Sequence, residues 1–424
     1  MAGTRRVGAR EHPRKLLNLE GDYSLSTIRR LGLDQVLTSR DLDGFFEHVW
    51  TVHPMVGASA DEPLETAVGP PSSEDVAPRH TIVEGRVAYS PRLRRIPVLN
   101  FLIGQAVLLV RLDRLIRRES ISLIRANDPF YLGILGVLLA RRRRIPLVVR
   151  LIANYDGNFY ASGSPAYPRL FRRRAIEKWL GRNVLRRADL VAAGNYDILN
   201  YALANGADAE RSTVFLVGNL IDSFHFEEAP EDRPSVRGEL GLDDRPLAIC
   251  VGRLEPDKHP EDVVRAVAQA RLRERGVVAL LVGDGTMRPQ LEAMARELGV
   301  EDDVVFAGNR DQRWIAAAYS SADIVLSPVT GRALVEAQLS GTPVVAYDVD
   351  WQSELVHDGE TGLLTPYRDV EAMADAVDRL LADRQWARSL GAVGREYTAK
   401  VMDPDALTAH ERQQYEKVLA SARR

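Results

Sequence analysis

Short hydrophobic runs, rich in β-branched residues, alternate along this chain with longer segments of helical periodicity. In the first half these runs lie at 15–19, 48–53, 123–127, 147–153, 190–193 and 214–217. In the second half they lie at 247–251, 278–282, 304–307, 324–327, 344–347 and 362–364, with helices expected from near 260, 286, 312, 332, 352 and 370. Strands that alternate with helices are typical of βαβ units. The pattern predicts an α/β protein built on parallel, doubly wound, Rossmann-like sheets.

Breaks in this alternation indicate the domain organisation. A chain of 424 residues is longer than one ordinary core requires, so two domains are expected. The acidic segment 223–245 contains Pro230 and Pro234 and is predicted to be a linker between domains 1–222 and 246–403. A final amphipathic helix within 404–424 is a candidate to pack back on the first domain. Residues 56–80, rich in Pro, Ser, Ala, Asp and Glu, are predicted to form a loop.

Composition and charge restrict the class of partner. Hydrophobic residues make up 45% and charged residues 27% of the chain, which is typical of a globular protein. The net charge is only −3, but basic residues exceed acidic ones in 101–200. This excess indicates either an anionic partner, such as a phosphorylated acceptor or a membrane surface, or simply a solvated arginine-rich surface. Few aromatic residues accompany the arginines, so no nucleic-acid partner is expected.

Two further features bear on the cellular compartment. The single cysteine, Cys250, lies in an apolar run and cannot form an internal disulfide. No apolar segment follows the N-terminal arginines, so a signal peptide is not expected. We therefore expect a cytoplasmic location. The apolar stretch 98–110 is too short to span a bilayer. It is either a core helix or an interfacial helix on the inner face of the plasma membrane, followed by the basic residues Arg111, Arg114, Arg117 and Arg118.

The first candidate cluster follows the run 247–251. Gly252 allows a ligand to approach the backbone, and Arg253 and Lys258 bring two cations to a strand-to-helix junction. A diphosphate requires such groups, because arginine supplies forked donors and lysine a point charge. The alternative is two ordinary surface cations.

The next two clusters are glycine turns after strands. Gly283 belongs to a Gly-Asp-Gly turn after 278–282, and Asn309 and Arg310 follow a Phe-Ala-Gly sequence after 304–307. Either turn could simply reverse the chain. In a nucleotide-binding domain, backbone groups near Asn309 could read the edge of the base.

The fourth cluster follows the run 324–327. Thr330 can cap a helix that begins near Arg332, so that the amides of Gly331, Arg332 and Ala333 point toward a phosphate. Glu336 lies about one turn further and could accept hydrogen bonds from vicinal hydroxyls. A solvated helix carboxylate is the alternative, although the apolar neighbours of Glu336 do not favour it.

The order of these clusters, over roughly 185–395, strongly resembles the family-4 retaining glycosyltransferases, which adopt the GT-B fold of two Rossmann-like domains facing a central cleft. The resemblance also includes Ser-Gly-Thr-Pro-Val-Val-Ala at 340–346 and Asp-Gly-Glu-Thr-Gly-Leu-Leu at 358–364. It implies that Arg253 and Lys258 hold the donor diphosphate and that Glu336 holds the ribose. The loop that ends at Gly331 would contact the phosphates and the donor sugar, and Asn309 and Arg310 would contact the base.

One departure from the family pattern bears on the donor sugar. The family usually has two glutamates eight residues apart, and the earlier one contacts the donor sugar. Glu336 matches the later one, and the position of the earlier one is Pro328 here. Val329 and Thr330 also replace the usual residues, and His259 stands where the family often has glycine. Either other groups read the sugar, or the chain has lost catalysis.

In the first half the candidates are fewer. The segment Gly21-Asp22-Tyr23 follows the first strand and could approach the diphosphate, and Asp128 and Asp156 follow later strands. The carboxyl ends of parallel strands are where an acceptor would bind. Capping and turn formation are the alternative roles for both aspartates.

Together these features predict a retaining glycosyltransferase that uses a nucleoside-diphosphate sugar, UDP- or GDP-linked, and an unidentified acceptor. The acceptor could be lipid-linked or a small glycan precursor. No residue cluster has metal-ligand spacing, so neither a metal nor a further cofactor is expected. The alternatives are a non-catalytic nucleotide-sugar-binding subunit and a nucleotide-sugar epimerase.

Overall fold

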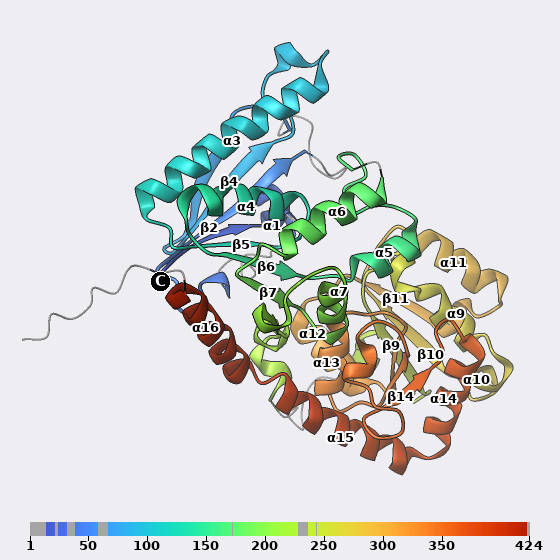
Figure 1. The fold of residues 1–424 in the computed structure, drawn as a ribbon. Coiled ribbons are helices and arrows are strands. Elements are labelled where there is room, and N and C mark those ends of the chain that lie inside the picture. Colours follow the sequence, from blue (N-terminus) through green and yellow to red (C-terminus); the bar gives the residue numbers. More distant parts are fainter. Residues whose placement is uncertain are drawn as a thin grey trace, which may run out of the picture. The chain divides into compact units, whose positions relative to one another are not determined.

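The computed structural model describes residues 14–21, 24–31, 39–57, 67–171, 173–227, 236–242 and 244–421. The chain forms two compact units, Met1–Phe215 with Thr408–Arg424, and Leu216–Leu407 (Figure 1). Each described core cluster lies within a single unit.

The first unit is built on an eight-stranded sheet of order β3-β4-β2-β1-β5-β6-β7-β8. Neighbouring strands are parallel except β3 and β4, which are antiparallel. The strands are β1 (Lys15–Leu19), β2 (His48–Val56), β3 (Ser72–Ala77), β4 (His80–Arg86), β5 (Leu123–Ala126), β6 (Leu147–Leu151), β7 (Leu190–Ala193) and β8 (Ser212–Val214).

Helices cover both faces of this first sheet because alternate strand residues point to opposite faces. The helices are α1 (Leu25–Leu31), α3 (Pro97–Glu119), α4 (Tyr131–Arg143), α5 (Tyr155–Ser162), α6 (Arg174–Leu185), α7 (Tyr196–Ala204) and the final α16 (Pro404–Ser421). Leu17 and Leu19 belong to the core that α3 and α4 cover. Leu16 lies in a separate core with Tyr415 of α16, on the opposite face (Figure 1).

The second unit is built on a six-stranded, fully parallel sheet of order β11-β10-β9-β12-β13-β14. The strands are β9 (Leu247–Val251), β10 (Val278–Val282), β11 (Val304–Gly308), β12 (Ile324–Ser327), β13 (Val344–Tyr347) and β14 (Leu363–Thr365). The helices are α8 (Val236–Glu239), α9 (Pro260–Val267), α10 (Ala270–Glu274), α11 (Arg288–Glu297), α12 (Gln312–Ser321), α13 (Ala333–Leu339), α14 (Val370–Ala382) and α15 (Arg384–Val401).

Most predicted strands of both sheets are observed, and four local predictions are wrong. Thr330, predicted to cap the helix that begins near Arg332, makes no cap bond, because Arg332 is the N-cap of α13 and the Thr330 hydroxyl contacts that of Ser327. The segment 56–80, predicted to be a loop, contains β3, an edge strand whose residues 72–75 are polar and exposed and therefore give no apolar pattern. The strand predicted at 214–217 is β8 at Ser212–Val214. The helix expected near Gln352 is only a 3-10 turn, Gln352–Glu354.

The division into units does not follow the predicted linker. Leu216 and Val217 pack against the core of the second unit, so the first unit ends before the predicted boundary at 222. The predicted linker, 223–245, contains α8, whose Val236 is buried in that same core. Burial of apolar side chains therefore joins the described part of this acidic segment to the second unit.

Candidate functional site

The sheet of the second unit has its switch point between β9 and β12. From β9 the strand order runs through β10 to β11 on one side and through β12 to β14 on the other. Ligands of doubly wound sheets bind where the order reverses, outside the carboxyl ends of the strands. A Cβ atom built on Gly252, after β9, would lie 3.9 Å from Cγ2 of Thr330, after β12. The first and fourth predicted clusters therefore adjoin.

The loops after β9, β10 and β11 are joined by backbone hydrogen bonds. The Gly252 N–H donates to the Val282 carbonyl at 3.0 Å, and the Gly283 N–H donates to the Gly308 carbonyl at 2.9 Å. Gly283 has a φ of 131°, and a Cβ atom there would lie 2.0 Å from the Gly252 carbonyl oxygen. Close packing of the loops is thus sufficient to require glycine at 283, and a role of Gly283 in donor binding stays a prediction.

The two predicted phosphate-binding cations share one carboxylate. Nη2 of Arg253 lies 3.3 Å from Oδ2 of Asp257, and Nζ of Lys258 lies 3.4 Å from the same oxygen. The Arg253 side chain is 66% exposed, so it can turn toward an incoming anion. A diphosphate would compete with Asp257 for both cations.

Glu336 is buried in α13 with only 3% of its surface exposed. Burial raises its pKa to about 7, and nearby Asp222 adds to this effect, whereas Arg332 opposes it. Nε of Arg332 lies 3.3 Å from Oε1 of Glu336. Sequence reasoning did not select Asp222, although it directly precedes the predicted linker. A buried carboxylate with a single ion-pair partner retains acceptor capacity for ligand hydroxyls.

In the loop predicted to contact the base, Arg310 already has partners within the protein. Asn309 is exposed, but Arg310 donates to the Ala307 carbonyl and to the Glu239 carboxylate, both at 3.1 Å. The guanidinium of Arg310 also lies 4.6 Å from the ring centre of Trp314. These contacts give Arg310 a structural role, and its contact with a base stays a prediction.

His259 adopts the left-handed backbone conformation, with a φ of 52°. Glycine is the residue that adopts this conformation at least cost, which explains why a glycine would suit this position. The imidazole contacts the Tyr367 hydroxyl at 2.7 Å and also the guanidinium of Arg368. The loops after β9 and β14 are therefore linked. Sequence reasoning missed Tyr367 and Arg368 because no motif marks them.

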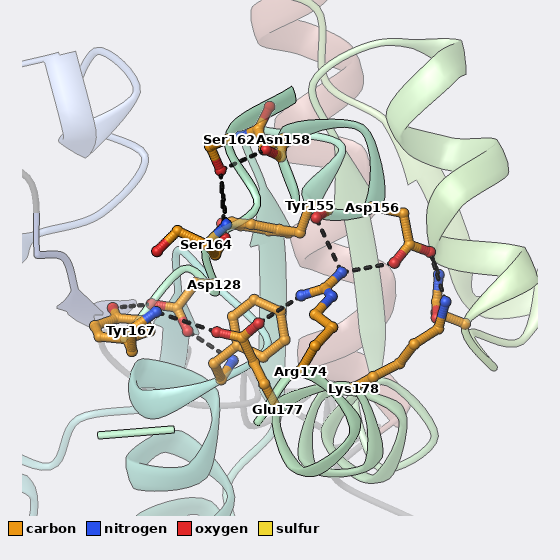
Figure 2. Close-up of polar contacts among 12 residues, drawn as sticks. Asp128, Tyr155, Asp156, Asn158, Ser162, Ser164, Tyr167, Arg174, Glu177 and Lys178 are labelled. Atoms are coloured by element: carbon orange, nitrogen blue, oxygen red, sulfur yellow. Dashed lines mark hydrogen bonds and ion pairs between the residues drawn. The ribbon is translucent and has the colours of Figure 1, made fainter. Parts of the chain in front are cut away.

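The sheet of the first unit has its switch point between β1 and β5. Gly21 follows β1 and Asp128 follows β5, while Asp22 and Tyr23 lie outside the described residues. Both carboxylate oxygens of Asp128 accept hydrogen bonds at 2.6 Å, one from the Phe130 N–H and one from the Tyr167 hydroxyl (Figure 2). These bonds support the turn-forming role for Asp128, and a catalytic role stays a prediction.

Asp156 lies at the centre of a second polar network (Figure 2). Its carboxylate accepts hydrogen bonds from Arg174 at 2.6 Å, Lys178 at 2.8 Å and Asn205 at 3.1 Å. Burial would raise the pKa of Asp156, but these donors hold it below the usual range. Arg174 also binds Glu177, which accepts from the backbone N–H at position 167. The network fixes the segment between α5 and α6.

Other features bear on metals and membranes. Among the described residues no group of three or more His, Cys, Asp or Glu could hold a metal ion. None of the described helices is long and apolar enough to cross a membrane. A cavity of about 1250 Å³ lies between α3 and the first sheet, near the amino ends of β1 and β2, and is lined by residues that include Lys15 and His48. It is therefore not at the predicted site.

Comparison with known proteins identifies the family. Residues 232–397 match the family described as Glycosyl transferases group 1, and residues 28–218 match the Glycosyl transferase 4-like domain. The chain is 31% identical over 316 residues to a GDP-mannose-dependent alpha-(1-6)-phosphatidylinositol monomannoside mannosyltransferase of Mycobacterium tuberculosis, a match that covers 71% of this chain and 77% of that protein. The chain belongs to the group 1 glycosyltransferases.

Two other relatives of this chain match over a smaller part of their length. An alpha-D-kanosaminyltransferase of Streptomyces kanamyceticus is 31% identical, over 58% of this chain and 64% of that protein. A D-inositol 3-phosphate glycosyltransferase of Nocardia farcinica is 33% identical, over 61% of this chain and 58% of that protein. The chain thus spans about three fifths of the length of these two relatives.

Solved structures confirm the predicted GT-B fold. The Anabaena protein HepE in complex with UDP has a TM-score of 0.71 at 22% identity, covering 97% of this chain and 100% of HepE. A sucrose-phosphate synthase of Thermosynechococcus elongatus has a TM-score of 0.72 at 21% identity, covering 96% and 100%. At these identities the likeness concerns the fold alone.

Proposed function

We propose that this protein is a retaining glycosyltransferase that moves a sugar from a nucleoside-diphosphate sugar to an acceptor. The observation that carries the proposal is that the loop after β9, which precedes Arg253 and Lys258, adjoins the loop after β12, which leads into α13 with its buried Glu336, at the β9–β12 switch point. Two cations suit a diphosphate, and a buried carboxylate suits vicinal ribose hydroxyls.

In the proposed reaction the anomeric C–O bond to the diphosphate breaks, and negative charge grows on the departing nucleoside diphosphate. Arg253 and Lys258 stabilise that charge, and fixed cations of this kind need no metal ion to act. The acceptor hydroxyl forms the new C–O bond on the same face and loses its proton. Retention rests on the family resemblance.

The donor is proposed to be UDP- or GDP-linked. HepE is described in complex with UDP and with UDP-glucose, and the mycobacterial relative is named as GDP-mannose-dependent. The relatives are also named as transferases, which favours a transferase over an epimerase.

A thermal-shift screen tests the donor site. The purified protein is heated with UDP, GDP, ADP, TDP or CDP, with and without magnesium. A ligand that binds only the folded state raises the melting temperature. At a ligand concentration of 100 times its Kd, the free energy of unfolding increases by about 2.7 kcal/mol. We expect a rise with UDP or GDP that does not depend on magnesium. No rise with any nucleotide would contradict the proposal.

A non-catalytic nucleotide-sugar-binding subunit is the second candidate, and Pro328 is the observation that favours it. Pro328 has no side-chain hydrogen-bonding group where the family usually has a glutamate. Such a subunit would bind the nucleotide in the thermal screen. It would not release nucleoside diphosphate from any nucleotide sugar, either by transfer or by slow hydrolysis.

Contact with an anionic membrane is proposed for α3. Near its N-terminus Val98 is 70% and Leu102 57% exposed, whereas Leu108 and Leu112 are buried in the core. The helix therefore serves as a core helix and still presents apolar side chains outward, followed by exposed Arg114. We expect sedimentation with anionic vesicles at low salt, and weaker sedimentation for the double variant Val98→Asp, Leu102→Asp. Equal recovery with neutral vesicles would argue against an electrostatic contribution.

A further inference from the structure

The loop between β12 and α13 lacks the usual acidic side chain, and a buried glutamine holds its backbone. Gln352 is 1% exposed and follows β13 by a few residues. Its amide nitrogen donates to the carbonyl oxygens of Pro328 at 2.8 Å and Tyr347 at 3.0 Å. Its amide oxygen accepts from the Ser327 hydroxyl at 2.7 Å. Both amide protons are thus used, and the side chain joins the ends of β12 and β13.

The hydrogen-bond network of Gln352 extends through Ser327 to Thr330. The Ser327 hydroxyl has one proton, which it gives to Gln352, so its contact with the Thr330 hydroxyl requires Thr330 to donate. This bond fixes the rotamer of Thr330, whose methyl group lies toward Gly252 in the adjoining loop. Gln352 thereby determines, through Ser327, how Thr330 faces the switch point.

The bond to Pro328 also orients a backbone donor. In a trans peptide the C=O and the following N–H point in opposite directions. Because the Pro328 carbonyl points into the core at Gln352, the Val329 N–H points out of it. Within the described part of the chain this N–H has no hydrogen-bond acceptor. A phosphate or sugar oxygen of a donor would supply one.

We propose that Gln352 is a positioning residue of the donor site, which fixes the loop 328–331 so that the Val329 N–H meets an oxygen of the nucleotide sugar. The inference rests on the proposed function, since it requires a donor at the switch point. With Pro328 the loop has no side-chain acceptor at the family's usual carboxylate position, and the Val329 N–H next to it offers the nucleotide sugar a backbone donor.

Gln352→Met tests the proposal, because methionine fills a similar volume and makes none of the three hydrogen bonds. Gln338→Met is the matched control: Gln338 is 0% exposed and donates to the Thr361 carbonyl at 3.1 Å, away from the loop. The first measurement is the NMR order parameter of the backbone amides of residues 329–331 without ligand. The second is the Kd for the nucleoside diphosphate that the wild type binds.

We expect Gln352→Met to lower the order parameters at 329–331 and to weaken nucleotide binding about tenfold. Gln338→Met should lower the melting temperature with neither effect. Unchanged order parameters and affinity in Gln352→Met would overturn the positioning role. If Gln352→Met lowers the order parameters but the wild type binds no nucleoside diphosphate, the proposed function fails, and the role in donor binding fails with it while the loop contact stands.

Discussion

At the scale of single residues, the environment of Glu336 makes its protonation depend on folding. Burial raises its pKa from 4.5 to about 7. The folded protein therefore binds a proton at Glu336 more tightly than the unfolded chain does. This contribution to stability is complete below about pH 4.5 and is lost as the pH rises through about 7. A ribose, by contrast, prefers the ionised carboxylate, which accepts two hydrogen bonds.

We therefore predict opposite pH trends for stability and binding. In Glu336→Gln the titration is absent, so the unfolding free energy of the wild type relative to this variant should fall between pH 5 and pH 8, by at most about 3 kcal/mol. Nucleotide affinity of the wild type should rise more steeply over the same range than that of Glu336→Gln, because ionisation of the terminal phosphate strengthens binding to both proteins alike. Chemical denaturation and calorimetric titration measure the two trends, with exposed Glu297→Gln as the control. Parallel pH profiles for wild type and Glu336→Gln would refute the assignment.

The pair formed by Lys258 and Asp257 gives a second prediction at this scale. Lys258→Ala should reduce donor turnover about 100- to 1000-fold with the fold intact, because it removes a cation that we propose stabilises the leaving group. Asp257→Asn should strengthen nucleotide binding, because the carboxylate lies 3.4 Å from Nζ of Lys258 and would compete with phosphate for that cation. Release of nucleoside diphosphate and nucleotide Kd at low salt measure these effects. Near-normal turnover in Lys258→Ala would remove Lys258 from the mechanism.

At the scale of elements, the loop after β14 stabilises the start of α9 through buried charges. Arg368 lies 2.6 Å from the Glu261 carboxylate and 3.2 Å from that of Asp262, whose side chain is 1% exposed. Burial raises the pKa of Asp262, while hydrogen bonds from His259 and Arg368 outweigh burial and lower the pKa of Glu261 to about 2. Arg368 thus favours the ionised form of both adjacent carboxylates.

Arg368→Met should therefore lower the free energy of unfolding by about 3 kcal/mol, because it leaves buried carboxylates without their cation. Arg271→Met removes an arginine that pairs with exposed Glu371 and Asp375, and should cost less than about 1 kcal/mol. Urea denaturation at neutral pH compares the two variants. Equal losses would mean that burial does not strengthen the Arg368 contacts.

Local sequence patterns predicted elements well where burial produces them. All five residues of β9 are buried, so an apolar run marks the strand. β3 lies at a sheet edge, with Ser72 and Glu74 exposed, and its position follows from pairing with β4, a partner that no local pattern specifies. The glycine turn at Gly283 was recognisable, but its packing against Gly252 was not, because that contact depends on the register of two strands.

At the scale of the whole molecule, the sequence indicated which loops adjoin, but it did not indicate which side chains fix those loops in place. The order of motifs and the GT-B resemblance indicate that the loops of Arg253 and Thr330 meet, and sheet topology places both at the switch point. Gln352, Tyr367 and Arg368 stand in no motif, and their roles depend on contacts between loops after different strands. Such contacts require the fold to be known.

The two units have separate hydrophobic cores, so they should respond separately to perturbation. Tyr415 of α16 is 0% exposed, packs against Phe46 and Phe215, and accepts a hydrogen bond from buried Arg125 at 3.3 Å. Tyr415→Ala should therefore destabilise the first unit by about 3 kcal/mol or more. Arg368→Met should destabilise the second.

Scanning calorimetry of the full chain tests this independence. We expect Tyr415→Ala to lower one transition and Arg368→Met to lower another, because Tyr415 belongs to a core of the first unit and Arg368 pairs with carboxylates of the second. The nucleoside diphosphate should raise chiefly the transition that Arg368→Met lowers, since Arg253, Lys258 and Glu336 all belong to that unit. A single transition shifted by both variants would show that the units unfold together. If the nucleotide instead raised the Tyr415-sensitive transition, the donor would bind chiefly to the first unit, and the assignment of Arg253, Lys258 and Glu336 would be wrong.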